Sequence, residues 1–240
     1  MGISVCYEAN EAFYIPVGHK ERTELKKDIV LKKLKPILED PSIKKVGQNI
    51  KYDFIIFKNN GIELSSVEDT MLLSYTLDAG NNRHNMDTLS ELHLGHKTIS
   101  YKDLVGTGKK QLNFADVDIK PATEYAAEDA DITLRLYEVL SERVSEEKLE
   151  RVYEEFEKPM IKILSRLEMN GIKVDDAYLK KLSKKFEERL ITIEKEIYKI
   201  SGKKFNIGSP KQLGEIIYND LKIAKLKKTK KGSLATSAKI

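Results

Sequence analysis

Two pairs of residues combine a polar side chain with an aspartate four positions later. Asn49 and Asp53 follow the short stretch "KKVG", and Tyr125 and Asp129 lie in "EYAAEDAD". A spacing of four places both members of a pair on one face of a helix. Two acids that converge on one point repel each other unless a cation lies between them, and carboxylate oxygen suits hard divalent metals. A tyrosine one turn before such an acid is well placed to orient a water for attack on phosphorus.

Both aspartates also have a structural interpretation that needs no chemistry. An aspartate near a helix start is more often a cap or a partner of the helix dipole than a metal ligand. Two pairs with the same spacing favour chemistry more than either pair does alone. From spacing alone, both interpretations stay open.

Charge is unevenly distributed along the 240 residues. The net charge is +4, and residues 203–240 hold 10 Lys against Glu215 and Asp220, a local +8 that leaves −4 for residues 1–202. This distribution favours a polyanion at one end and cations at the other. The single cysteine, Cys6, cannot form an internal disulfide and is typical of a reducing compartment. Because we find no long apolar run and no signal-peptide pattern, we expect a soluble, cytoplasmic protein without a membrane partner.

Strand and helix patterns alternate over the first 145 residues. We predict a hairpin from strands at 2–7 and 12–17, a helix near 24–40, a strand at 44–48, a helix from Asn49, a strand that turns into a helix over 67–80, and a helix from Ala122. This alternation predicts an α/β domain with a mixed sheet. The polar stretch 81–121 is expected to bind a ligand. Long helices ending at Gly171 and Gly202 follow, so we divide the chain into an α/β domain, 1–146, and an all-α segment, 147–240.

Five motifs occur in a fixed order: "VGQNIKYD", "DTMLLSY", "RHNMDTLSE", "HKTI" and "YAAEDADIT", followed by "LSRLEMNGIKVD" and "FNIGSPKQL". Together they resemble the 3′-to-5′ proofreading exonuclease domain, of the DEDD type, and the thumb base of the bacterial DNA polymerase I family (family A). The resemblance implies a ribonuclease H-like α/β fold with a mixed sheet, followed by the helical start of the thumb. It also implies that two Mg²⁺ or Mn²⁺ ions, roughly 3.5 to 4 Å apart in such sites, hydrolyse the terminal phosphodiester. DNA replication and repair in the bacterial cytoplasm, near the nucleoid, would be the setting.

The resemblance implies roles for individual residues. Asp53 and Asp129 match two of the family's four metal-binding acids, Tyr125 matches its water-orienting tyrosine, and Asn49 matches an active-site asparagine. Residues that match the groove for the single-stranded 3′ end are Gln48, Lys51, Tyr52, Arg83, His84, Met86 and Tyr101. Arg83 would contact a phosphate, and Tyr101 would wedge against the terminal bases, where stacking is worth roughly 1 to 3 kcal/mol per base.

The lysine-rich stretch "KLKKTKKG" has two interpretations. It is either a solvated tail or the tip of the thumb, which contacts phosphates of a primer-template duplex. The resemblance around it favours the second, and the residues that would contact phosphates are Lys227, Lys228, Lys230 and Lys231.

One family motif has no counterpart here. The family's Asp-x-Glu pair, which supplies two of the four acids, lies on a first strand before the segment matched by "MGISVCYEANEAFYIPVG" and in the centre of the sheet. We therefore expect little or no exonuclease activity from this chain alone. We also expect a sheet that is rearranged, or completed by a strand from the rest of the polymerase or from a partner chain. A non-catalytic DNA-binding module and a nuclease completed by a partner chain are the alternatives.

Overall fold

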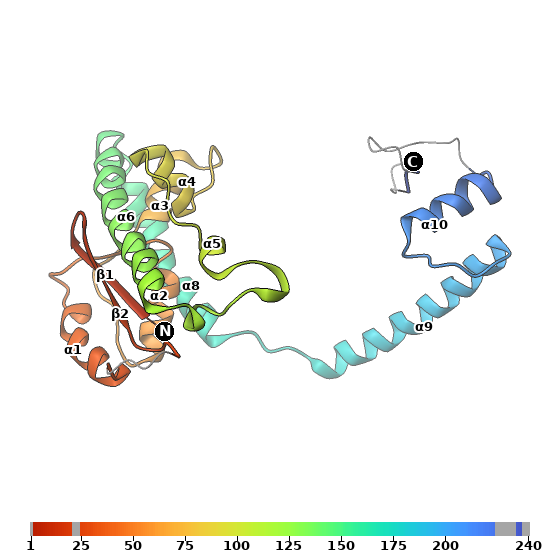
Figure 1. Ribbon diagram of the computed structural model, residues 1–240, viewed down its shortest axis with the longest axis horizontal. Helices are drawn as coiled ribbons and strands as arrows, with labels where there is room; N and C mark the ends of the chain where they lie inside the picture. The colour runs from red at the N-terminus through yellow and green to blue at the C-terminus, as the bar shows by residue number, and fades with distance from the viewer. Residues whose placement is uncertain (1, 21–24, 224–233, 237–240) are drawn as a thin grey trace. The chain divides into compact units, whose positions relative to one another are not determined.

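The computed structural model describes residues 2–20, 25–223 and 234–236, and the chain forms two compact units, Met1–Gly171 and Ile172–Ile240. The first unit is a mixed α/β structure (Figure 1). Its strands are β1 (Gly2–Glu8), β2 (Glu11–Pro16), β3 (Lys45–Gly47) and β4 (Val67–Asp69). Its α-helices are α1 (Lys27–Glu39), α2 (Lys51–Asn59), α3 (Thr70–Asp78), α4 (Met86–Leu89), α5 (Tyr101–Val105), α6 (Ile119–Glu146), α7 (Glu150–Val152) and α8 (Lys158–Asn170).

Shorter helical turns connect these elements. Short stretches of π-helix lie at Ser90–Leu94 and Tyr153–Glu157, and 3-10 turns lie at Gly108–Lys110 and Phe114–Asp116. The predicted hairpin, the strand before Asn49, the strand-to-helix transition at 67–80 and the long helix near Ala122 are all confirmed. Gly80 has a φ of 83°, a conformation that favours glycine and suits the end of α3.

The described strands form two separate sheets of two strands each. In the antiparallel hairpin of β1 and β2, Ser4 pairs with Tyr14, and in the parallel pair of β3 and β4, Gly47 lies opposite Asp69. The sequence predicts one mixed sheet. Both pairing modes are present, but they lie in different sheets, because within the described residues β1 and β3 each pair on one side only.

Helix α6 contacts both sheets and carries much of the core of the first unit. It packs against β1, β2 and β3, and Figure 1 shows it running along the hairpin. Ile132, Leu136 and Leu140 are fully buried at intervals of four residues, and they pack with Leu73 of α3. Burying each such side chain contributes roughly 1.5 to 3 kcal/mol. This apolar face of α6 therefore packs against the helical layer, and α6 as a whole also contacts both sheets.

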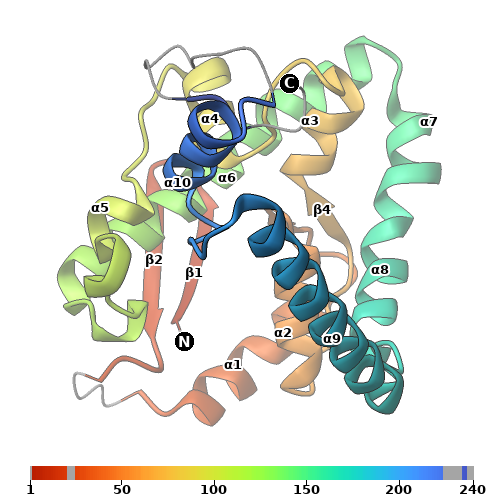
Figure 2. The same ribbon diagram turned by 90° about the vertical axis from the view of Figure 1, so that its right-hand side faces the viewer.

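The helical segments that follow α6 contribute to two buried clusters of the first unit. Tyr153 is buried in the cluster of Leu136 and Leu140, and Ile161 of α8 packs with Phe54 of α2 and Val67 of β4. Figure 2 shows α8 beside the end of the unit that contains β4 and α2. Residues up to Gly171 therefore belong to the first compact unit.

The second unit contains α9 (Asp176–Ser201), α10 (Pro210–Glu215) and a π-helical stretch at Ile216–Asp220. Asp175 caps α9 by accepting from the Tyr178 amide at 2.8 Å, and the left-handed Gly202 ends it. Ser209 caps α10 with Pro210 at its first position, as predicted. Among the helices of the described residues, none has the length and apolar character needed to cross a bilayer.

Candidate metal and nucleic-acid site

The parallel strands β3 and β4 end side by side, and a short turn, residues 48–50, leads from β3 into α2. Gly47 and Asp69 are opposite each other at the carboxyl ends of the two strands, an edge at which α/β proteins commonly bind ligands. The turn into α2 requires a glycine, because a Cβ at Gly47 would lie 2.8 Å from the Ile50 Cγ1 atom. Asn49 in this turn has a left-handed backbone with a φ of 57°. This geometry places Asp53 in the first turn of α2.

The Asp53 carboxyl is held in surroundings that disfavour its charge. Nearby protein atoms displace water, and the negative charge of Asp69 adds repulsion, so the pKa of Asp53 rises to about 6, although the residue keeps an exposed face. A bound divalent cation would favour the ionised form and lower this pKa. Asp53 is not the N-cap of α2, because that position is occupied by Ile50, so the structural interpretation that remains is an interaction with the helix dipole.

Asp69, which the sequence patterns did not single out, is a buried acid between two helix starts. It is 1% exposed, and its carboxylate accepts from the amides of Asn49 and Ile50 at 3.0 Å each and of Met71 at 2.9 Å. Burial raises the pKa of Asp69, and these amides act in the opposite direction. The signal was present in the sequence, because the acid ends the strand "VED" and precedes a helix, as an N-cap does.

Tyr125 and Asp129 meet on one face of α6, as their spacing predicts. Each side chain shifts the pKa of the other, so the Tyr125 hydroxyl and the Asp129 carboxylate lie close together. Burial, together with the charges of Glu128 and Asp87, raises the pKa of Asp129 to about 7, and burial and Asp129 raise the pKa of Tyr125. Within the described residues the Asp129 Oδ1 atom is buried and has no hydrogen-bond partner. One side of this carboxylate is therefore available to a cation or a donor.

Two aromatic rings pack against the ring of Tyr125. Tyr101 stacks on Phe114 with centroids 6.3 Å apart, and its ring is 5.9 Å from the ring of Tyr125. Phe114 contacts Tyr125 at 6.1 Å, so three rings from α5, a 3-10 turn and α6 pack together. The sequence motifs singled out Tyr101 but not Phe114, because the ring contact spans segments without a common periodicity.

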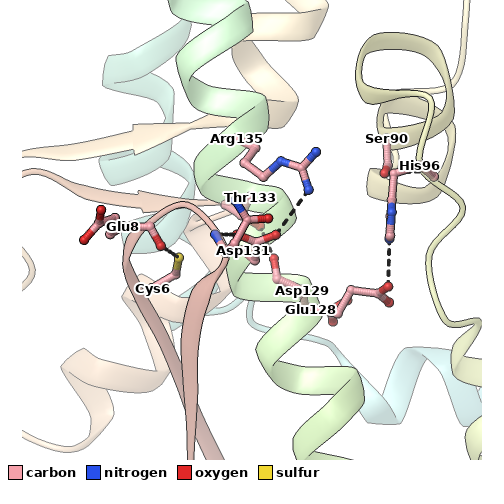
Figure 3. A network of polar contacts seen from close by, with 10 residues as sticks. Cys6, Glu8, Ser90, His96, Glu128, Asp129, Asp131, Thr133 and Arg135 are labelled. Carbon is pink, nitrogen blue, oxygen red and sulfur yellow. Dashed lines mark hydrogen bonds and ion pairs between the residues drawn. The ribbon is translucent and has the colours of Figure 1, made fainter.

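The segment of α6 around Asp129 is fixed on two sides (Figure 3). The Glu128 carboxylate binds His96 Nε2 at 2.8 Å and the Ile99 amide at 2.6 Å, which ties α6 to the segment before Tyr101. Asp131 accepts from the amide of Asn10 in the β1–β2 turn at 2.5 Å. These contacts restrain the register of α6 relative to the hairpin and to α5.

The side chains expected to line a single-strand groove have varied surroundings. Gln48 donates to the His84 carbonyl at 2.7 Å and accepts from the Thr70 hydroxyl, while the His84 ring bonds Ser74 at 2.9 Å. Lys51 forms an ion pair with Glu168, and the Met86 sulfur accepts a weak hydrogen bond from the Thr133 hydroxyl. The remaining three side chains are exposed: Tyr52, Arg83 and Tyr101. Lys227, Lys228, Lys230 and Lys231 lie outside the described residues.

The structure gathers the expected site residues into two groups. Asn49 and Asp53 lie with Asp69 at the β3–β4 edge, and Tyr101, Tyr125 and Asp129 lie together along α6, which packs against β3. The charge that raises the pKa of Asp53 is that of Asp69, whereas the charges that raise the pKa of Asp129 are those of Glu128 and Asp87.

The carboxylates fit Mg²⁺ or Mn²⁺ in donor type, since hard divalent cations prefer oxygen. They fall short in number, because no group of three or more His, Cys, Asp or Glu in the described part of the chain is placed to hold a metal. The arrangement therefore offers acids suited to a divalent ion but no complete site made by these residues alone.

Comparisons with known proteins agree on one family. A family model described as 3′-5′ exonuclease matches residues 1–145, and one described as DNA polymerase family A matches residues 176–240. DNA polymerase I of Rhizobium leguminosarum is 45% identical over 95% of this chain and 24% of its own length. DNA polymerase I of Pseudomonas aeruginosa is 42% identical over 99% of this chain and 27% of its own length. The chain thus spans about a quarter of the length of these curated relatives.

A solved structure has a similar fold. The POL domain of Pol1 from M. smegmatis, in complex with DNA primer-template and dNTP, aligns with a TM-score of 0.67. The alignment covers 95% of this chain and 36% of that one, at 24% sequence identity. This likeness concerns the fold.

Proposed function

Because this chain belongs to the 3′-5′ exonuclease family, we propose that its first unit binds the 3′ end of single-stranded DNA beside the β3–β4 edge, where Asp53 and Asp129 bind divalent metal. The fold proposed for this unit is the ribonuclease H-like one. In the intact family site, two Mg²⁺ or Mn²⁺ ions stabilise charge during phosphodiester hydrolysis. The biological role would be proofreading in DNA replication and repair.

The observation that carries this proposal is the unpaired, buried Oδ1 of Asp129 beside the Tyr125 hydroxyl. A carboxylate with a purely structural role is expected to have its buried oxygens paired. Here burial raises the pKa of Asp129 to about 7, and such shifts gather at functional sites. A cation at this oxygen would supply the missing partner.

The neighbours of the two acids have distinct roles in this proposal. Tyr125 keeps its proton at neutral pH, because the ordinary pKa of tyrosine is 10.0 and burial and Asp129 raise it further, so its hydroxyl can hold and orient a water. Asn49 lies one turn before Asp53 at the start of α2 and would contact the terminal nucleotide. The single-stranded DNA would lie along the following residues: Gln48, Lys51, Tyr52, Arg83, His84, Met86 and Tyr101.

We expect binding of a 3′ end with little or no hydrolysis by the chain on its own. The described residues provide no set of three metal donors. A two-ion site needs more ligands than Asp53 and Asp129 supply, so hydrolysis would require acids from outside these residues.

A binding titration with a labelled oligothymidylate tests the proposal. We expect the affinity to fall with salt and to rise when Mg²⁺ or Mn²⁺ replaces a chelator, and the metal-dependent gain to disappear in Asp53→Asn and Asp129→Asn. Asp28→Asn, which changes an exposed aspartate of α1, is the matched control and should behave as the wild type. An equal metal response in all four proteins would contradict the proposal.

A second candidate function is a nuclease completed by another strand. It is supported by β1 and β3, which both contact α6 and each pair on one side only among the described residues. A strand from a partner chain, or from the rest of a polymerase chain, could pair there and bring an Asp-x-Glu motif to Asp53 and Asp129. Adding a peptide with this motif should then produce metal-dependent cleavage. Binding without cleavage under any such addition would instead favour a non-catalytic DNA-binding module.

The second unit is proposed to bind duplex DNA. Its match to DNA polymerase family A and the local charge of +8 over residues 203–240 support contact with primer-template phosphates. The residues proposed to make it are Lys227, Lys228, Lys230 and Lys231.

A further inference from the structure

The Asp69 carboxylate joins the starts of two helices, α2 and α3, at the carboxyl ends of the paired strands β3 and β4. Its Oδ1 atom accepts from the amides of Asn49 at 3.0 Å and Met71 at 2.9 Å, and its Oδ2 atom accepts from the amide of Ile50 at 3.0 Å. Met71 lies in the first turn of α3, and Ile50 is the N-cap of α2. Amides at helix starts lack partners within their helix, so one buried carboxylate satisfies donors from both.

Only part of this arrangement is needed to cap α3. A serine at an N-cap stabilises a helix about as well as an aspartate does. The burial of a carboxylate at 1% exposure costs free energy that a cap alone does not require. The additional reach of the carboxylate is used for Asn49 and Ile50, on the segment that leads to Asp53.

Asn49 needs such a restraint because its backbone is left-handed, with a φ of 57°. Asparagine adopts this conformation more readily than most residues other than glycine, but it still keeps it where the surroundings determine it. The Asn49 carbonyl accepts from the Tyr52 amide at 3.0 Å, so its conformation directs the first turn of α2. Asp53 follows in that turn.

The backbone of Asp69 is itself restrained. Its amide donates to the Tyr153 hydroxyl at 3.1 Å, and Tyr153 donates to Glu68 at 2.9 Å. Lys158 binds the other oxygen of Glu68 at 2.7 Å. The acid that holds the start of α2 is therefore anchored in the core of the first unit.

We propose that Asp69 is a positioning residue, whose carboxylate holds Asn49 in its left-handed conformation and so sets where Asn49 and Asp53 meet a metal ion and a DNA 3′ end. The functional part of this inference rests on the function proposed above. Asp69 acts through the amides of Asn49 and Ile50 and need not touch the ligand.

The variant Asp69→Ser separates positioning from capping. Serine can still accept from the Met71 amide, but its hydroxyl is too short to bridge to Asn49 and Ile50. We expect hydrogen exchange of the Asn49 and Ile50 amides to accelerate while Met71 stays protected. Mn²⁺ affinity, measured by electron paramagnetic resonance, should weaken about 10-fold or more, as it does when a group that orients a metal ligand is removed.

Two further variants distinguish a positioning role of Asp69 from a general loss of stability. Val144→Ala removes a buried group from the far end of α6 and should lower stability without either effect. Asp69→Asn keeps the oxygen that accepts from the amides of Asn49 and Met71. It replaces the oxygen that accepts from the Ile50 amide with an NH₂ group, which cannot accept that hydrogen bond. Faster exchange confined to Ile50 is expected there, so if Asp69→Ser fails to fold, this variant still tests whether the carboxylate holds the start of α2 through the Ile50 amide.

The outcomes distinguish this inference from the proposed function. Unchanged exchange at Asn49 and Ile50 in Asp69→Ser, unchanged exchange at Ile50 in Asp69→Asn, or changes equal to those in Val144→Ala, would overturn the positioning role. So would an unchanged Mn²⁺ affinity in Asp69→Ser when Asp53→Asn weakens it. If Asp53→Asn itself leaves Mn²⁺ affinity unchanged, the proposed metal role of Asp53 fails, and amide exchange alone still decides whether Asp69 fixes the start of α2.

Discussion

At the scale of single residues, the raised pKa of Asp129 links its function to stability. The carboxyl has an ordinary pKa of 3.8 and reaches about 7 in the fold, so the folded protein holds a proton that the unfolded chain has released between these values. The contribution to stability is fully present below about pH 4 and is lost as pH rises through about 7. Asp53, with a pKa of about 6, acts in the same direction.

We predict that Asp129→Asn raises the free energy of unfolding by about 1 to 2 kcal/mol near pH 8, because it removes a buried charge without a full set of partners. Near pH 5 the difference from the wild type should shrink, since Asp129 is then mostly protonated. Urea unfolding at both pH values, with a chelator present, measures this. Asp28→Asn serves as control, and an equal change with pH in all three proteins would contradict the prediction.

At the scale of elements, Tyr153 connects the π-helical stretch before α8 to β4. Its hydroxyl donates to Glu68 and accepts from the Asp69 amide, and the ring is 3% exposed. Both partners are buried, so neither can form a replacement hydrogen bond with water if the hydroxyl is removed. The contact joins residues 85 positions apart in the chain and fixes β4 against the helical layer.

We predict that Tyr153→Phe lowers the free energy of unfolding by about 1 to 3 kcal/mol, the usual cost of leaving buried polar groups unsatisfied. Tyr178→Phe is the matched control, because that tyrosine is 60% exposed on α9, and it should change stability little. Denaturant unfolding of both variants provides the measurement. Equal stability of Tyr153→Phe and the wild type would show that the buried network contributes nothing net.

At the scale of the whole molecule, a short exposed segment connects the two compact units along the chain. No helix or strand is assigned from Gly171 to Asp175, and Ile172 in it is 91% exposed. Exposed segments with few contacts are the preferred sites of proteolysis. Lys173 places a tryptic site inside this segment.

We predict that, within the described residues, brief trypsin treatment cleaves first after Lys173 and cuts the described helices of the first unit only later. Mass spectrometry of the early fragments checks this. Lys173→Gln should remove that cut and leave the rest of the pattern as it is. First cuts inside α6 or α8 would contradict the division into these units.

The uneven charge of the chain leads to a second prediction at this scale. Replacing Lys227, Lys228, Lys230 and Lys231 with Gln should reduce the salt dependence of primer-template binding, by a slope of up to about 0.9 for each phosphate that the variant no longer neutralises. The same number of exposed lysines on α9 provides a control of equal charge change: Lys180, Lys181, Lys184 and Lys185. Equal slopes for both quadruple variants would show that net charge, and not these four lysines, sets the affinity.

The sequence by itself determined the elements of this protein and its family. The hairpin, the strand before Asn49, α6 and the helix ends at Gly171 and Gly202 follow from periodicity, caps and glycines, which act within a few residues. The pairing of Tyr125 with Asp129 was predictable for the same reason, because both lie on one helix.

Only the tertiary structure decided how distant segments meet. The Asp69 carboxylate contacts amides about 20 positions earlier, Phe114 joins the rings of Tyr101 and Tyr125, and the strands form two sheets where one was predicted. Such contacts depend on how helices and strands pack against a shared core. Local sequence signals do not encode that packing. A cap or a periodic apolar face indicates that a helix or strand packs against another element, but it does not indicate which element that is.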